Sequence, residues 1–373
     1  MPVPIRRVLR SLAVPVLVAL AVAGVAPSAA GAGEPAGAVY VLTNEAAANA
    51  VVAFARAGDG DLAVQGSFPT GGRGTGAGLG SQGALVLNDD GSLLFAVNAG
   101  SNTVTTFAVQ PDGLRRVGVS PSGGARPISL TVHGDLLYVL NAGAVANVSG
   151  LRIGAGGSLT PIAGSRQPLS NPFPNPAQVG FSPDGRLLVV TEKSTQLIDV
   201  YRIRSDGRAA LPAIRQSVGI EPFGFAFTST GHLLVSEAFN GTPGHSAVTS
   251  YDPVRMDLAV VSPSVNTHQT AACWVVVTSD GRFAFTTNTG SGTESSFQVG
   301  PDGTLALLDP AAGRNGAHSA PIDLDLTDDD AFLYVLSSGF GTVSGFAVSD
   351  SGGLAGMATF GQLPPSSSGL AAR

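Results

Sequence analysis

A phrase of two apolar runs joined by a short polar stretch recurs seven times along this chain. Its clearest copy runs from Asp90 to Asn98 and continues from Thr103 to Val109. Each copy closes on a large side chain, at Phe54, Phe107, Leu151, Tyr201, Tyr251, Phe297 and Phe346. These markers lie 53, 44, 50, 50, 46 and 49 residues apart, which defines seven repeats. Short strands and tight turns repeating at this period are typical of a β-propeller, in which each repeat forms one four-stranded blade.

The first strand of each repeat alternates between two kinds of residue, as a strand with two different faces does. One face is apolar and should form the core between blades: Leu85/Leu87, Leu130/Val132, Val179/Phe181, Phe225/Phe227, Val275/Val277 and Leu324/Leu326. The other face is small or polar and should line a central channel: Ala84/Val86, Ser129/Thr131, Gln178/Gly180, Gly224/Ala226, Trp274/Val276 and Asp323/Asp325.

The ends of the repeats predict how the ring closes. The first repeat begins at Val39 in what should be its second strand, with no inner strand before it. The tail from Ser368 to Arg373 has the length and pattern of that missing strand. We expect it to complete the first blade, because closure removes two open sheet edges. The sequence therefore predicts an all-β, seven-bladed propeller occupying residues 33–373 as one domain.

Residues 1–32 have the pattern of a secretory signal peptide. Arg6, Arg7 and Arg10 precede an apolar stretch from Ser11 to Val25, and small residues follow it. We expect a secreted, extracellular or cell-envelope protein that meets the membrane only through this signal. The general secretory route, the twin-arginine route and an uncleaved anchor remain alternatives.

Charge and cysteine content narrow the function classes. The net charge is −6, and no Lys/Arg cluster follows the signal, which argues against a nucleic-acid partner. Cys273 is the only cysteine, so no intramolecular disulfide can form, and its apolar neighbours favour a buried, inert thiol. A monomer is expected.

The connections of a propeller emerge on two faces. One face carries the longer connections, which run from the outer strand of one blade to the next blade and between the second and third strands of a blade. We call it the loop face. We call the opposite one the turn face. The expected long loops are Thr70–Ser81, Gln167–Asn175, Ser262–Ala271 and Pro310–Ala320. Functional residues are disproportionately found on such loops.

The phrases Phe181–Val190 and Asn98–Val104 resemble those of the lactonase-type seven-bladed propellers. That family includes bacterial 6-phosphogluconolactonases and fungal carboxymuconate-lactonizing enzymes. The resemblance covers essentially all of residues 33–373, but it rests on framework residues. It therefore implies the fold more strongly than the chemistry.

The resemblance also implies which catalytic residues should be present, and several are not. Active members carry Pro-His-x-His before one inner strand and Pro-Arg-His before the next. Here Asn175 and Ala177 replace the histidines, and Phe223 replaces the arginine. An acid is retained as Glu237. Lactone opening needs an activated water and donors for the oxyanion, and neither Ala177 nor Phe223 can supply them.

We therefore expect a binder of a small molecule, such as a lactone or carbohydrate, or a scaffold for a protein partner. The alternative is a divergent lactone hydrolase that uses Glu237 with His268 or His318. The remaining candidates are ligand-binding residues on the loop face: Asp323, Trp274, Glu192 and Arg126. Glu237, His268 and Asp323 are expected to border one depression near the channel mouth.

Neither a metal nor a cofactor is expected. The run Asp323–Asp330 lacks the glycine and spacing of an EF-hand loop. The glycine-rich segment Gly71–Gly80 lacks the spacing of a dinucleotide-binding fingerprint, and no helix follows it.

Overall fold

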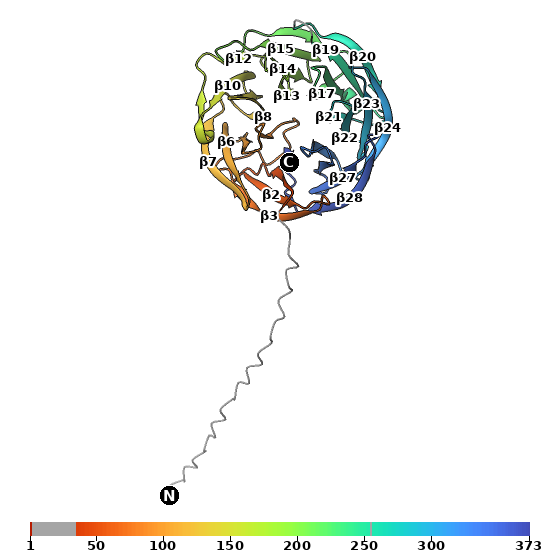
Figure 1. Ribbon diagram of the computed structural model, residues 1–373. Coiled ribbons are helices and arrows are strands. Elements are labelled where there is room, and N and C mark those ends of the chain that lie inside the picture. Colours follow the sequence, from red (N-terminus) through yellow and green to blue (C-terminus); the bar gives the residue numbers. More distant parts are fainter. Residues whose placement is uncertain (2–34, 254–255) are drawn as a thin grey trace. The chain divides into compact units, whose positions relative to one another are not determined.

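The computed structural model describes Met1, residues 35–253 and residues 256–373. The predicted signal peptide, apart from Met1, lies outside the described residues. The chain divides into two units, Met1–Gly33 and Glu34–Arg373, of which the second is described below. In the second unit seven antiparallel sheets are arranged around a central axis (Figure 1). The predicted seven-bladed, all-β propeller is confirmed.

Blades 1 to 4 follow in chain order, and the strands of each are named from the axis outward. Blade 1 is β29 (Leu370–Ala372), β1 (Gly37–Leu42), β2 (Ala50–Arg56) and β3 (Leu62–Pro69). Blade 2 is β4 (Leu85–Leu87), β5 (Leu93–Asn98), β6 (Thr103–Gln110) and β7 (Gly113–Pro121). Blade 3 is β8 (Pro127–His133), β9 (Leu136–Asn141) and β10 (Asn147–Ile153), with the short β11 (Leu159–Pro161) and β12 (Gln167–Pro168) both paired to β10. Blade 4 is β13 (Pro176–Phe181), β14 (Leu187–Glu192), β15 (Leu197–Arg202) and β16 (Ala213–Gln216).

Blades 5 to 7 have the same order. Blade 5 is β17 (Pro222–Phe227), β18 (Leu233–Glu237), β19 (Ala247–Asp252) and β20 (Ala259–Asn266). Blade 6 is β21 (Ala272–Val277), β22 (Phe283–Asn288), β23 (Thr293–Val299) and β24 (Leu305–Arg314). Blade 7 is β25 (Pro321–Leu326), β26 (Phe332–Ser337), β27 (Thr342–Val348) and β28 (Leu354–Gly361). None of the helices among the described residues is long and apolar enough to span a membrane.

The C-terminal strand closes the ring as predicted. β29 pairs antiparallel with β1, with Tyr40 opposite Ala371, and so becomes the innermost strand of blade 1. The last residue is held on both sides: the Arg56 Nε donates to the Arg373 carbonyl at 3.1 Å, and the Arg373 guanidinium donates to the Gly91 carbonyl of blade 2 at 2.9 Å. The chain end is therefore built into the ring rather than laid against it.

The predicted faces of the inner strands are also found. Core positions such as Leu130, Val275 and Leu324 are buried between blades. Half of the alternate positions are half-buried along the axis: Val86, Thr131, Gln178, Ala226, Val276 and Asp325. Trp274 and Asp323 are instead buried, and β21 and β25 each shift register next to them.

Two of the expected long loops are shorter than predicted. Strand β20 extends to Asn266 and β24 to Arg314, so only residues 267–271 and 315–320 remain as connections. Pro263 and Pro310 both lie in the outermost strands of their blades, β20 and β24. An edge strand tolerates proline because one of its sides needs no N–H donor.

Candidate functional site

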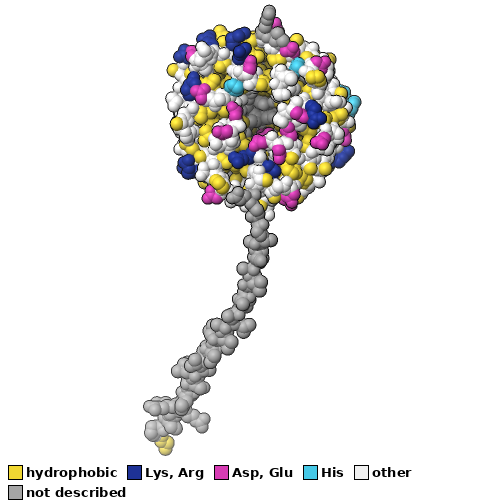
Figure 2. Space-filling view, viewed as in Figure 1, with side chains coloured by type: hydrophobic (Ala, Val, Ile, Leu, Met, Phe, Trp, Pro, Cys, Tyr) yellow, Lys and Arg dark blue, Asp and Glu magenta, His cyan; other side chains and the backbone are white. Residues whose placement is uncertain are grey.

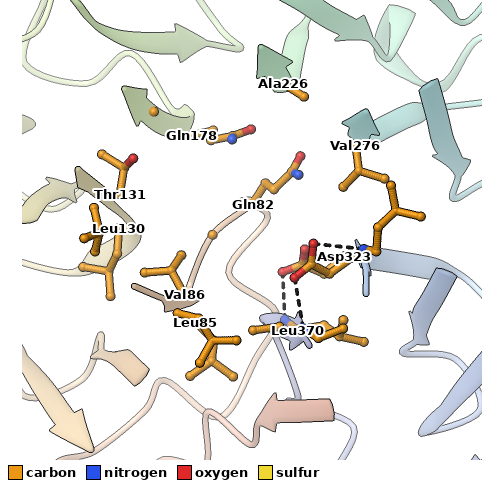
Figure 3. Close-up of a pocket in the computed structure, with 18 of the residues that line it drawn as sticks. Gln82, Leu85, Val86, Leu130, Thr131, Gln178, Ala226, Val276, Asp323 and Leu370 are labelled. Carbon is orange, nitrogen blue, oxygen red and sulfur yellow. Dashed lines mark hydrogen bonds between the residues drawn. The ribbon is translucent and has the colours of Figure 1, made fainter. Parts of the chain in front are cut away.

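A central cavity of about 570 Å³ runs along the ring axis. Its wall is formed by the inner strands, with Val86, Thr131, Gln178, Ala226 and Val276 around it (Figure 3). Residues of the turn face also line it: Asn88, Asp89, Gly91 and Asp328. The space-filling view shows the resulting hollow at the centre of the ring (Figure 2). A ligand would enter the cavity from the turn face.

The loop-face end of this cavity is closed by residues 78–83, which we call the plug. The Trp274 indole N–H donates to the Ser81 carbonyl at 2.9 Å, and the Lys193 ammonium donates to the Gly80 carbonyl at 2.5 Å. The Ser81 hydroxyl donates to the Ile128 carbonyl at 2.8 Å. The plug is therefore bonded to blades 3, 4 and 6 at once, and the cavity is blind at this end.

Gln82 fixes the centre of the plug. Its side-chain amide donates to the Val275 carbonyl at 2.9 Å and accepts from the Val275 N–H at 3.2 Å. This two-way pairing satisfies a backbone donor and acceptor of β21 that face the axis. Gly224 of β17 leaves the space for it, since a Cβ there would collide with Gln82 Oε1. In Figure 3 the Gln82 side chain stands in the middle of the ring.

The charged groups of the central cavity are all acidic. Asp89, Asp323, Asp325 and Asp328 line it, and no Lys, Arg or His is among the described residues that do so. Burial raises the pKa of Asp325 to about 7, and burial together with the Asp325 charge raises the pKa of Asp323 well above its usual range. Phe181, Phe225 and Phe227 add aromatic surface from blades 4 and 5.

Asp323 and Asp325 also fasten the closing strand. Asp323 accepts from the Leu370 N–H at 3.2 Å, and Asp325 accepts from the Ala372 N–H at 3.0 Å. Both carboxyl groups belong to β25, so they join blade 7 to β29 of blade 1. The sequence predicts Asp323 as a ligand contact; the hydrogen bond to Leu370 adds a structural role that its position in the sequence does not reveal.

A second cavity of about 340 Å³ lies beside the plug. Trp274, Asp323, Ser81 and Ser338 are among its lining residues. Trp274 and Asp323 are thus brought together, as expected, but Glu237 and His268 line neither this cavity nor the central one. The Trp274 indole is only 4% exposed and packs on Phe223, with 4.8 Å between ring centroids.

Glu237 is fully buried at a corner of blade 5. Its carboxylate accepts from the Gly219 N–H at 2.9 Å and from the Ser264 hydroxyl at 2.7 Å, and the Thr249 hydroxyl also donates to it. Burial raises the pKa of Glu237 above its usual range. The corner is a repeated framework position at the end of the second strand in blades 2 to 7, and in the other five of these blades it is occupied by Asn98, Asn141, Glu192, Asn288 and Ser337.

The other predicted site residues are dispersed. His268, His318 and Arg126 are exposed on separate connections of the loop face. Glu192 is fully buried in the framework corner of blade 4. Among the described residues, no hydrogen bond joins Glu237 to either histidine. The structure therefore brings together only Trp274 and Asp323 of the proposed set.

A lysine occupies the region where the family arginine is lost. Lys193 follows β14, and its ammonium lies 4.5 Å from the centroid of the Phe223 ring. Burial lowers the pKa of Lys193 to about 8. Reasoning from the sequence missed both Lys193 and Gln82. Gly224 at a channel-facing position and the glycine-rich segment before Gln82 were the signals that could have indicated a chain crossing the axis.

Comparisons with known proteins agree with this architecture. The family model described as "Lactonase, 7-bladed beta-propeller" matches residues 32–172. A putative 6-phosphogluconolactonase from Bacteroides uniformis is similar in structure, with a TM-score of 0.71 and 17% identity, covering 90% of this chain and 99% of that one. A periplasmic gluconolactonase from Pseudomonas aeruginosa, PpgL, gives 0.69 and 18%, covering 90% of this chain and 99% of that one. No curated protein matches the chain.

The closed ring of seven sheets, six of four strands and one of five, places this chain in the class of seven-bladed β-propellers. Within that class, the match of residues 32–172 to the lactonase propeller model agrees with the resemblance seen in the sequence. At 17–18% identity the structural likeness establishes the fold alone, so the chemistry has to be argued from the residues present.

Proposed function

We propose that this chain is an exported propeller that binds a small, uncharged polar molecule of the carbohydrate or lactone kind in its central cavity. The observation that carries the proposal is the cavity itself, of about 570 Å³, lined at the turn face and blocked at the loop face by Gln82. Cavities of this size and shape are the usual form of small-molecule sites.

The lining supports a neutral ligand. Carboxylates such as Asp325 and Asp89 can accept hydrogen bonds from hydroxyl groups, and Phe181 and Phe227 offer apolar surface to a sugar ring. The carboxylates of Asp89 and Asp328 repel an anion, and no basic side chain among the lining residues offsets them. A phosphorylated sugar or a carboxylate-bearing lactone product is therefore disfavoured.

The alternative, lactone hydrolysis by Glu237 with His268 or His318, has less support. A general base has to reach the water that it activates, directly or through one further water. Glu237 lines neither cavity and is already occupied by three donors. Export is supported only by the basic and apolar pattern of residues 1–32. A protein partner on the loop face is the second kind of ligand that the same proposal allows.

Calorimetric titration with a panel of ligands tests the proposal. The panel consists of neutral monosaccharides, glucono-δ-lactone and 6-phosphogluconate. We expect binding of at least one neutral member and none of the phosphorylated one. Val276→Trp fills the cavity and should abolish binding, while Val119→Trp, a matched change on the exposed outer strand β7, should preserve it.

The outcomes separate the two functions. Binding that survives Val276→Trp unchanged would remove the central cavity as the site. Lactone turnover above the spontaneous rate that is lost in Glu237→Gln, in a variant that remains folded, would favour the hydrolase instead.

A further inference from the structure

Two carboxyl groups meet inside blade 4. Glu192 ends β14, Asp199 lies in β15, and both residues are fully buried. The N–H of Ser170 contacts both of them, with its nitrogen 3.0 Å from Glu192 Oε1 and 3.1 Å from Asp199 Oδ2. Two acids that share one donor at these distances are close neighbours.

No cation compensates the pair among the residues that the structure describes. The hydrogen-bonding partners are neutral: the Ser170 and Thr195 hydroxyls donate to Glu192, and the Tyr201 hydroxyl lies 3.2 Å from Asp199 Oδ2 and 2.9 Å from the Pro168 carbonyl oxygen. Tyr201 is the only titratable group among these partners. Two ionised carboxylates in such a place would repel each other and lose their hydration without compensation.

The nearby basic side chains point elsewhere. The Lys193 ammonium contacts Gly80 and lies over Phe223. Arg215 of β16 pairs with Asp257, and Arg152 of β10 pairs with Asp135. The adjacent strands β12 and β13 carry no titratable side chain. Among the described residues, no basic side chain therefore neutralises the pair.

The sister blades show that a second acid is not needed for the framework. Asp199 pairs with Val190, which lies two residues before the end of the second strand of blade 4. At the equivalent position of the third strand, five other blades have a hydroxyl-bearing residue: Thr105, Ser149, Thr249, Ser295 and Ser344. In blades 2, 3 and 6 that hydroxyl accepts from the corner Asn. Among these six blades, blade 4 alone has a carboxyl group there.

One atom of the pair lacks a partner. Asp199 Oδ1 is buried, and no described group donates to it or accepts from it. A carboxylic acid, unlike a carboxylate, has an O–H that can donate. A proton shared between the two groups would complete the hydrogen bonding of the corner.

We propose that Glu192 and Asp199 hold one proton between them at neutral pH, and that this pair is a pH-sensitive latch fastening residues 169–175 of the loop face to blade 4. Burial, with the Glu192 charge as the next cause, raises the pKa of Asp199 to about 8, in agreement with this arrangement. The latched segment presents Phe173, which is 75% exposed, and leads into β13.

The direction of the switch follows from the raised pKa. The folded protein keeps the proton at pH values where the unfolded chain, with an Asp pKa of about 3.9, has released it. The latch is therefore fully closed at acidic pH and weakens as the pH rises through about 8. Above that pH the second negative charge repels Glu192 and loosens the hold on Ser170.

Hydrogen exchange of residues 169–175 as a function of pH tests the latch, after correction for the intrinsic exchange rate. In the wild type we expect exchange to accelerate about tenfold or more between about pH 7 and about pH 9. Asp199→Asn and Asp199→Thr, which place neutral groups as in the sister blades, should remove this dependence. Residues 122–126, held by Asn141 without a carboxyl group, are the internal control.

The proposal is overturned if wild-type exchange in 169–175 is independent of pH, or if Asp199→Asn keeps the wild-type dependence. Should the variants fail to fold, carbon-detected NMR titration of the wild-type Asp199 carboxyl decides instead. Ionisation of both Asp199 and Glu192 below neutral pH would contradict the shared proton.

Discussion

The side-chain amide of Gln82 occupies the space that a Cβ on Gly224 would need. The two residues come from different parts of the ring, Gln82 from the connection between blades 1 and 2 and Gly224 from the inner strand of blade 5. Elsewhere the inner strands bridge neighbouring blades with their own side chains, as Ser129 does to the Val179 N–H and Gln178 to the Phe225 N–H. At the seam between blades 5 and 6, Gln82 takes over that role from Gly224.

Gly224→Ala should destabilise the protein by about 1–3 kcal/mol, because the new methyl group would collide with Gln82 Oε1 and with the Cys273 carbonyl oxygen and would disturb the pairing of Gln82 with Val275. Urea unfolding at fixed pH measures the change. Gly118→Ala is the matched control, since a Cβ at Gly118 in the exposed strand β7 would meet nothing within 4 Å. Equal stability of the two variants would show that the plug can move without loss.

Gln82→Ala should cost about 1–3 kcal/mol, because it leaves the N–H and carbonyl of Val275 without partners. In combination with Gly224→Ala the losses should be less than additive, since both changes disturb the pairing of Gln82 with Val275. A double-mutant cycle measures this coupling. Additive losses would mean that Gln82 and Gly224 act independently.

The stability of the protein should fall as the pH rises from about 4 to about 8. Burial raises the pKa of Asp199 to about 8, of Glu294 to about 8 and of Asp325 to about 7. These groups bind protons in the folded state that the unfolded chain has already released, so raising the pH favours unfolding. Below about pH 4 the trend should reverse, because turn hydrogen bonds lower the pKa of exposed acids such as Asp280.

Denaturant unfolding at a series of pH values locates the predicted maximum near pH 4 to 5. Glu294→Gln removes one titrating group and should flatten the decline, while Asp112→Asn on the surface should leave it unchanged. A stability that rises steadily from about pH 5 to about pH 8 would show that these carboxyl groups are ionised in the folded protein.

The ring was predictable from the sequence because it is made of repeated local signals. Alternation along each inner strand identified core residues such as Leu130 and Val275, and the absence of a first strand before Val39 identified the closing role of the tail. These features depend on neighbours along the chain or on the same position in the next repeat.

The site was harder to predict because it depends on contacts between repeats. Gln82 and Gly224 lie in different repeats, far apart along the chain, and no periodicity connects them. Glu237 was proposed as a catalytic acid from its resemblance to an acid in the family, yet the structure gives it three framework donors. His268 and His318 were grouped with Glu237 because their loops share a face, but sharing a face does not bring side chains into contact.

Removing residues 368–373 should cause aggregation or a large drop in melting temperature. The deletion takes away β29, which pairs with the inner edge of β1, and leaves Asp323 and Asp325 without the Leu370 and Ala372 N–H groups that they accept from. Exposed strand edges and buried carboxylates without donors are both unfavourable. Arg373→Ala, which keeps all of β29, should be much milder. Light scattering and thermal unfolding distinguish the two, and a truncated protein as soluble and stable as the parent would mean that the ring does not depend on its tail.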